Sequence, residues 1–286
     1  MEKDKTGTVI ASSEASRETS DSGTITEKSS TNNQDGSTES ERVTEQSGDY
    51  IFNEVKKDTT GAVTETTEAS KVTEPNGDFV EKSETKDGND SVLASSEHLR
   101  KTEPDNSVTE KKAELRPDGT ADSKEVNKDS SGKVNKVVVA ETDSSGVTTE
   151  GSFEGKSDGN LAITQLSTTG TELVIPSSIT GLSDEVFTVT EIGKDALKGQ
   201  QIEKVIIPES VEKINTGAFK DCGITEIHIS GKVEKGMLAK NALAGNGTGK
   251  KGKGLSITVE SKKDQKALKK QLKKAGAPKA KVKVAK

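Results

Sequence analysis

The chain has 286 residues, of which 28% are hydrophobic, 2% aromatic and 31% charged. No apolar run approaches the ~20 residues of a transmembrane helix, and the N-terminal segment lacks the apolar stretch of a secretory signal. Cys222 is the single cysteine, and His98 and His228 are the two histidines, which excludes an intramolecular disulfide and a cysteine-rich zinc site. We therefore expect a protein that is not an enzyme and that holds no cofactor or metal.

Charge divides the chain into two regions. Residues 1–160 carry 20 Lys and Arg against 35 Asp and Glu, a net charge of −15, whereas residues 161–286 carry 22 against 13, a net charge of +9. Residues 250–286 alone hold 14 lysines against Glu260 and Asp264. Such asymmetry indicates regions with separate roles, which we place at residues 1–155 and 156–286.

The first region is a degenerate repeat. A short phrase recurs as DKTGTVIA at 4–11, DSGTITE at 21–27, DTTGAVTE at 58–65, DSSGKVNK at 129–136 and DSSGVTTE at 143–150. The glycines of this and shorter versions are most often about 13 residues apart, which suits an Asx-initiated turn followed by a β-prone stretch and another turn.

Two structures remain open for this acidic Ser/Thr/Glu-rich region. Only 22 of the first 150 residues are Val, Ile, Leu or Phe, and this composition favours a disordered spacer, because so little apolar surface cannot offset the entropy of ordering. The alternative is a single-layer β-meander with weakly specified register. Either structure would serve as an extended stalk.

The second region contains aliphatic repeats. Ile202, Val205 and Ile207 recur 22 residues later as Ile224, Ile227 and Ile229. A period of 22 to 24 residues is typical of leucine-rich repeats. An earlier unit at residues 173–176 precedes its counterpart at 205–208 by 32 residues, so ten residues around GLSDEVFT are inserted between them.

Alternation within each unit predicts which side chains face inward. In each short strand the first and third aliphatic residues point into a solenoid and the middle one points out. Stacking should bury Leu173/Ile175, Val205/Ile207 and Ile227/Ile229, with Ile192, Leu197, Ile214, Phe219 and Leu243 on the opposite wall. The expected fold is mainly β: a short leucine-rich repeat solenoid preceded by the stalk.

The repeat resembles a known family. The phrase IEKVIIPESVEKINTGAFKDC, from Ile202, is similar to the unit of BspA-type (Treponema-type) bacterial leucine-rich repeat proteins, L-x-x-I-x-I-P-x-x-V-x-x-I-x-x-x-A-F-x-x-C. The last 30 or so residues resemble that family's strand-helix-strand cap. The resemblance covers residues 158–286, although the third unit has Ser230 in place of Pro and Leu243 in place of Phe.

The resemblance implies a bacterial secreted or cell-surface binding or adhesion protein, whose ligand would be an extracellular protein or glycan. The alternative is a structural spacer or fibre-forming surface protein with no dedicated ligand. An ordered β-structure in residues 1–155 would favour the structural alternative, and a random coil would favour a tether that carries a binding module.

The candidate binding surface follows from the same alternation. The outward positions form two rows across the strands: Glu172, Lys204 and Glu226 in one, and Val174, Ile206 and His228 in the other. Three strands ~4.8 Å apart span only about 15 Å, which is small for a protein interface. We therefore expect weak binding by one copy.

Three further features have simple structural interpretations. Cys222 is expected to be a buried, inert thiol. Residues 244–251 resemble a phosphate-binding loop but have Ala244 in place of the first Gly and Lys251 in place of Ser or Thr, so we interpret them as a flexible insertion. A capping helix is expected from an N-cap at Ser261 to Gly276, with an apolar stripe of Ala267, Leu268, Leu272 and Ala275.

The other face of that helix is rich in lysine. No Arg follows Arg116 and no aromatic residue follows Phe219, so nucleic acid is not an expected partner. A solvated face is the simplest interpretation, and the alternative is attraction to an anionic surface polymer, to lipid headgroups or to the acidic stalk itself.

Overall fold

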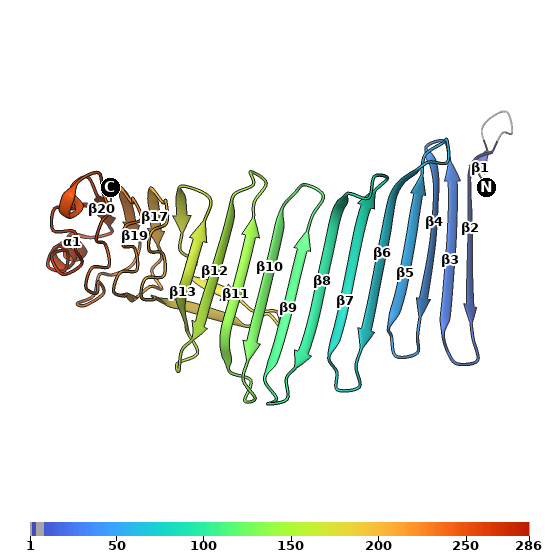
Figure 1. Ribbon diagram of the computed structural model, residues 1–286, viewed down its shortest axis with the longest axis horizontal. Coiled ribbons are helices and arrows are strands. Elements are labelled where there is room, and N and C mark those ends of the chain that lie inside the picture. Colours follow the sequence, from blue (N-terminus) through green and yellow to red (C-terminus); the bar gives the residue numbers. More distant parts are fainter. Residues whose placement is uncertain (1, 4–8, 286) are drawn as a thin grey trace. The chain divides into compact units, whose positions relative to one another are not determined.

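The computed structural model describes residues 2, 3 and 9–285 (Figure 1). The chain has two compact units: Met1–Glu103 with Glu110–Asp122, and Pro104–Thr109 with Ser123–Lys286. The division falls inside β9 (Val108–Leu115) and β10 (Ala121–Lys128). The predicted boundary at residue 155 follows composition and not compactness, so it stays a prediction.

The first unit is an antiparallel meander in which each strand pairs with the next along the chain. Its strands are β1 (Glu2–Lys3), β2 (Val9–Thr19), β3 (Ile25–Asn33), β4 (Gly36–Thr44), β5 (Tyr50–Lys57), β6 (Val63–Thr73), β7 (Phe79–Asp87) and β8 (Val92–Thr102). Between residues 10 and 103, Asp78 is the only buried residue, so these strands form a single layer. The meander is thus confirmed and the disordered spacer is wrong.

The recurring phrase forms the hairpin turns. In the copy at 58–65 the N–H of Asp58 donates to the Ala62 carbonyl (2.9 Å) and the N–H of Gly61 donates to the Asp58 carbonyl (3.0 Å). The Asp58 carboxylate also accepts from the N–H groups of Thr60 (2.8 Å) and Ala62 (3.1 Å), and Gly61 has φ 86°. A turn closed by a left-handed glycine matches a three-residue hairpin loop. The copies at 129 and 143 repeat these contacts, whereas the copy at 4–11 lies mostly outside the described residues.

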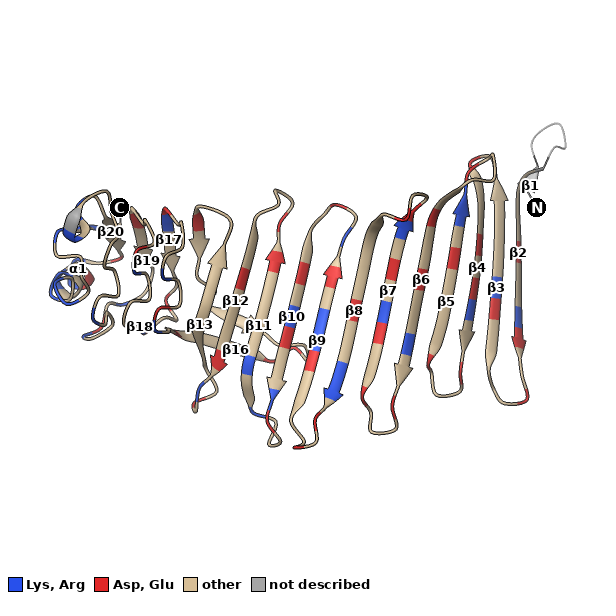
Figure 2. Cartoon of the chain, viewed as in Figure 1, with Lys and Arg blue, Asp and Glu red and all other residues tan. Residues whose placement is uncertain are grey.

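Polar contacts between strands replace an apolar core in this unit. Charged side chains of both signs alternate along the strands (Figure 2). Neighbouring strands carry ion pairs such as Lys28–Glu41 (3.0 Å) and Lys82–Glu97 (3.0 Å). Single exposed pairs contribute little, typically ~0–1 kcal/mol, so the meander depends on many of them together with its backbone ladder.

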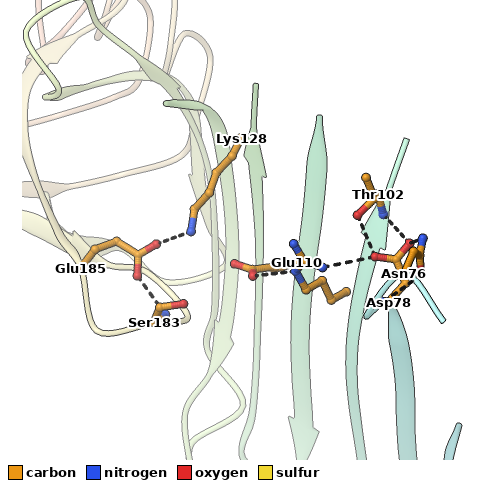
Figure 3. Close-up of polar contacts among 8 residues, drawn as sticks. Asn76, Asp78, Thr102, Glu110, Lys128, Ser183 and Glu185 are labelled. Atoms are coloured by element: carbon orange, nitrogen blue, oxygen red, sulfur yellow. Dashed lines mark hydrogen bonds and ion pairs between the residues drawn. The ribbon is translucent and has the colours of Figure 1, made fainter. Parts of the chain in front are cut away.

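Asp78 is the centre of the densest polar cluster in the first unit (Figure 3). Its carboxylate accepts from the backbone N–H (2.8 Å) and hydroxyl (2.7 Å) of Thr102 and from the Asn76 amide (2.8 Å). Arg100 lies 3.4 Å from Asp78 and 3.7 Å from Glu110. The bond from the Thr102 N–H leads the contacts that lower the pKa of Asp78. The cluster ties the β6–β7 turn to the end of β8.

The second unit contains strands in two groups. In the first group β11 (Val134–Thr142), β12 (Thr148–Gly155) and β13 (Leu161–Thr168) are antiparallel, and β13 pairs in parallel with β16 (Val186–Ile192). Strand β16 also pairs with β15 (Ser178–Thr180) and β18 (Lys213–Ile214). The second group is a parallel five-stranded sheet of β14 (Glu172–Val174), β17 (Lys204–Ile207), β19 (Glu226–Ile229), β20 (Ser256–Val259) and β21 (Lys281–Val284).

The residues predicted to fill the solenoid core are buried. The inward residues of β17 and β19 and the residues of the opposite wall are at most 2% exposed, as are Leu173 and Ile175. Strand β17 ends at Ile207, directly before Pro208. The mainly β solenoid inferred from the alternation is therefore correct.

The core nevertheless begins earlier than expected. Val126, Val137 and Phe153 are fully buried, although the sequence was interpreted as burying aliphatic columns only from about residue 158. The reason is the inserted segment, which forms the β15–β16 hairpin and lies over the strands that precede the repeats (Figure 1). Glu185 of this hairpin forms an ion pair with Lys128 of β10 (2.8 Å), and Phe187 packs against the core (Figure 3).

The C-terminal cap contains α1 (Lys262–Lys269) and the 3₁₀ turn η1 (Lys250–Gly252). As predicted, Ser261 is the N-cap, with its hydroxyl accepting from the Asp264 N–H (3.1 Å). The helix ends at Lys269 and not at Gly276, because the following residues continue the solenoid wall. There the carbonyls of Lys274 and Ala275 accept from the N–H groups of Asn241 and Leu243, each at 2.9 Å.

We predict that acid weakens the meander at its turns. A hydrogen bond from the Thr60 hydroxyl leads the contacts that lower the pKa of Asp58, and one from the Ser91 N–H leads those that lower the pKa of Asp87. A carboxyl group whose pKa is lower in the folded state stabilises the fold above its unfolded pKa, and this contribution disappears as the pH falls through the folded value. The β circular dichroism signal should therefore weaken below about pH 4. A signal that is unchanged or stronger at pH 2.5 than at pH 6 would contradict the prediction.

Candidate functional site

The strand register brings the six predicted site residues together. Glu172 pairs with Lys204 and Lys204 with Glu226, whereas Val174 pairs with Ile206 and Ile206 with His228. The two rows therefore lie side by side on the outward face of the parallel sheet. We call the outward residues of β14, β17, β19, β20 and β21 the binding face.

The binding face is larger than the sequence indicated. Strand β20 continues the register of β19, and β21 continues that of β20, so the rows extend to Ser256 and Lys281 and to Thr258 and Lys283. Counted in the same way, at ~4.8 Å per strand, five strands span about 24 Å. These strands were assigned to the cap, yet the alternation of Ile257/Val259 and Val282/Val284 was the available signal for two further rungs.

An apolar pair occupies the N-terminal half of the face. Val174 is 59% exposed, and Ile206 is half-buried between Val174 and His228. Beside them the Lys204 ammonium lies 2.8 Å from the Glu172 carboxylate, and this hydrogen bond leads the contacts that raise the pKa of Lys204. The apolar pair is therefore bordered by paired charges.

His228 occupies the middle of the face. Its Nε2 lies 3.0 Å from the Glu260 carboxylate, which follows β20 directly. The ring faces outward as predicted, and its side chain is 31% exposed. Sequence reasoning missed Glu260 as its partner, because β20 begins 30 residues after β19 and not at the 22-residue spacing of the repeat.

Cys222 is fully buried and its Sγ donates to the Leu197 carbonyl (2.8 Å). Burial is the main cause that raises the pKa of this thiol to about 11. The expected burial is confirmed. A thiol with this pKa and no access to solvent is unsuited to nucleophilic chemistry at neutral pH.

The loop that resembled a phosphate-binding motif has a structural role. Asn246 is 1% exposed, its amide donates to the carbonyls of Phe219 (2.6 Å) and Leu243 (3.1 Å), and its oxygen accepts from the Ile224 N–H (3.0 Å). The Asn246 side chain therefore hydrogen-bonds backbone groups of adjacent solenoid turns to one another. The prediction of a flexible insertion is wrong at Asn246.

Two further kinds of feature are absent from the described residues. No group of three or more His, Cys, Asp or Glu side chains in residues 2, 3 and 9–285 is placed to hold a metal ion. Over the same residues, no helix is both long and apolar enough to cross a membrane.

Comparison with known proteins identifies the repeats. The family model of the BspA type leucine-rich repeat region (6 copies) matches residues 190–242, which confirms the resemblance noted above for these residues. The crystal structure of a leucine-rich repeat protein from Bacteroides capillosus is similar at 21% sequence identity, covering 46% of this chain and 94% of that chain with a TM-score of 0.34. No curated protein sequence matches the chain.

We predict that Cys222 resists modification in the folded protein. At pH 8 a pKa of about 11 leaves about 100-fold less thiolate than the ordinary value of 9.0, and burial slows the reaction further. The rate of reaction with a chromogenic disulfide, with and without denaturant, measures this. Labelling of the native protein at the rate of the unfolded chain would contradict the assigned packing of this turn.

Asn246→Ala should lower the unfolding free energy by about 2–4 kcal/mol, because it leaves buried backbone groups without partners. Thermal and urea unfolding measure the change. Asn135→Ala is the matched control, since Asn135 is exposed on β11, and should change the unfolding free energy by less than about 0.5 kcal/mol. Equal losses of unfolding free energy in the two variants would contradict the role of Asn246 in hydrogen-bonding adjacent turns.

Proposed function

We propose, from the BspA-type leucine-rich repeats at residues 190–242, that the protein is a non-enzymatic binding protein of the bacterial cell surface or extracellular space. The repeat module binds an extracellular protein or glycan through the binding face. The meander acts as an extended stalk that holds the module away from its point of attachment.

The observation that carries this proposal is the composition of the binding face. Val174 and Ile206 present aliphatic side chains on a sheet face whose other outward residues are charged or polar. Aliphatic contacts at the centre of an interface with polar groups around them are typical of protein recognition. The Lys204–Glu172 and His228–Glu260 pairs hold hydrogen-bonding groups beside Val174 and Ile206.

The size of the face sets the strength of binding. A sheet about 24 Å wide offers less than the ~800 Å² per partner of a standard interface, so a single module binds weakly. Several copies on one surface raise the effective concentration and therefore the apparent affinity. This is the mode of action of an adhesin that acts in many copies.

A structural role is the second candidate, and a specific observation favours it. The first unit is an ordered meander, and among residues 2, 3 and 9–285 β1 pairs with β2 at Glu2 and Lys3, so most of the 11-residue strand β2 has no described partner on that side. Unpaired strand edges support assembly between chains. Sedimentation of the full chain separates the candidates, because a fibre-forming spacer self-associates as its concentration rises.

We predict that Ile206→Lys removes ligand binding without unfolding the module. The full chain is screened, as a monomer and as a clustered tetramer, against a panel of purified extracellular proteins and glycans. The ligand that binds most tightly is then tested with the Ile206→Lys variant. Clustering should raise the apparent affinity at least about 100-fold. Val186→Lys is the matched control, since Val186 is 64% exposed and lies outside the binding face.

The melting temperature of Ile206→Lys should fall by no more than a few degrees, because the middle residue of β17 is not part of the core. Equal affinity of the Ile206→Lys and Val186→Lys variants for the ligand would show that the binding site does not include Ile206. A panel that gives no ligand for the tetramer, together with concentration-dependent fibres, would replace this proposal with the structural role.

A further inference from the structure

The cap carries ten exposed lysines that have no ion-pair partner among the described residues, although the charge of Lys263 acts on the buried Asp264 carboxylate. We call them the lysine cap: Lys262, Lys263, Lys266, Lys269, Lys270, Lys273, Lys274, Lys279, Lys281 and Lys283. Four of the eight residues of α1 are lysines, which colour much of this helix blue in Figure 2.

The lysines of the first unit are arranged differently. In the first unit Lys28, Lys82, Lys101 and Lys112 each lie within 3.0 Å of a glutamate carboxylate. Most charged positions of the meander thus have an opposite charge nearby. The lysine cap departs from a pattern that the same chain follows over its first hundred residues.

The acidic side chain within the cap does not compensate these charges. Asp264 is 7% exposed, and its carboxylate accepts from the Val233 N–H (2.9 Å) and from the Ser261 hydroxyl. It faces inward with Leu268 and Leu272, while the lysines of α1 face solvent. Asp264 is therefore used to join the helix to the preceding turn.

The lysines of α1 also lower its stability. Lys262 and Lys266, and Lys266 and Lys270, are four residues apart, where like charges cost a helix about 0.2–0.5 kcal/mol per pair. Solubility does not require this arrangement, because alternating signs, as in the meander, would serve it without repulsion.

Protection of the terminal strand edge accounts for only part of the lysine cap. Lysines on an edge strand discourage pairing with other chains, and Lys281 and Lys283 lie on β21, at the end of the parallel sheet. The seven lysines between residues 262 and 274 lie on and after α1 and guard no strand edge.

We propose that the lysine cap binds a flexible linear polyanion whose charges are phosphate groups. Lysine is a compact point charge that attracts phosphate without demanding a fixed geometry, whereas the bidentate contacts that read ordered groups need arginine, which this region lacks. Stacking platforms for nucleobases are also lacking, since no aromatic residue follows Phe219.

A lipid bilayer fits the cap less well than a polymer does. A helix that binds a membrane surface inserts an apolar face among the acyl chains. Here Leu268 and Leu272 are buried in the module, and no Leu, Ile, Val or aromatic side chain of residues 261–285 is exposed. The cap offers charge alone, which suits a chain of phosphates that can follow the lysines from α1 toward β21.

The test uses the full chain and long-chain inorganic polyphosphate as the probe, with binding measured by calorimetry between about 50 and 200 mM salt. If four or five lysines each release one counterion, the logarithm of the affinity should fall with the logarithm of salt concentration with a slope of about −3. Changing Lys262, Lys266, Lys269 and Lys273 together to Gln should lower the affinity at low salt about 100-fold.

The matched control changes Lys28, Lys82, Lys101 and Lys112 to Gln, which removes the same charge from exposed positions of the first unit. It should bind polyphosphate like the unchanged chain. Circular dichroism and protection of Cys222 report folding. If the fourfold cap variant unfolds, the pairs Lys262/Lys266 and Lys269/Lys273 are changed separately, and each should weaken binding about tenfold.

Three results would overturn the proposal. Unchanged affinity in the cap variant, or an equal loss in the control, would show that the lysine cap is not the site. Equal or tighter binding to vesicles containing phosphatidylglycerol, at matched phosphate concentration, would assign the surface to lipid. Tighter binding to single-stranded DNA of matched charge would assign it to nucleic acid.

Discussion

Each turn of the solenoid has too few aliphatic side chains to bury them by itself. In β17 only Val205 and Ile207 point inward, and both are fully buried because the equivalent residues of β14 and β19 lie directly before and after them. Stability is therefore shared between neighbouring turns and is lost where a turn has no neighbour. This dependence explains why both ends of the repeat series carry additional structure.

The two ends meet this requirement in different ways. At the N-terminal end the inserted residues form the β15–β16 hairpin, so that Phe153 and Val137 join the same core as the repeats. At the C-terminal end α1 places Leu268 over the last turns, and Gln271 donates to the Glu234 carbonyl (2.8 Å) and accepts from the Leu238 N–H (3.0 Å). At the N-terminal end, apolar side chains cover the first turn of the repeats. At the C-terminal end, the Gln271 amide also hydrogen-bonds backbone groups that have no further turn to pair with.

The meander shows that β-structure in this chain does not need burial. From β2 to β8 its strands pair over eight or nine residues, most of its turns contain a glycine with positive φ, and charged side chains pair across its strands. Composition predicted disorder because that argument counts apolar surface alone. The recurring Asp-x-x-Gly phrase was the contrary signal, since a turn that defines its own register lowers the entropy cost of each hairpin.

Local alternation was sufficient to predict the inward and outward residues of β14, β17 and β19, and hence the two rows of the candidate site. It could not predict how many strands the sheet contains, because β20 is separated from β19 by a loop whose length breaks the 22-residue period. The partner of His228 was missed for the same reason. The early end of α1 was also beyond sequence reasoning, because backbone contacts from Asn241 and Leu243 override the helical pattern after Lys270.

Charge is used in opposite ways on the two candidate surfaces of the second unit. On the binding face Glu172 and Lys204 neutralise each other at 2.8 Å, so neither adds a long-range field, and recognition there depends on shape, hydrogen bonds and the exposed aliphatic side chains. On the lysine cap no such neutralisation occurs, and the resulting field attracts anions at distances limited only by screening. Added salt therefore acts mainly on the lysine cap, which includes Lys281 and Lys283 at the β21 end of the binding face, and acts less on Val174 and Ile206 toward the other end.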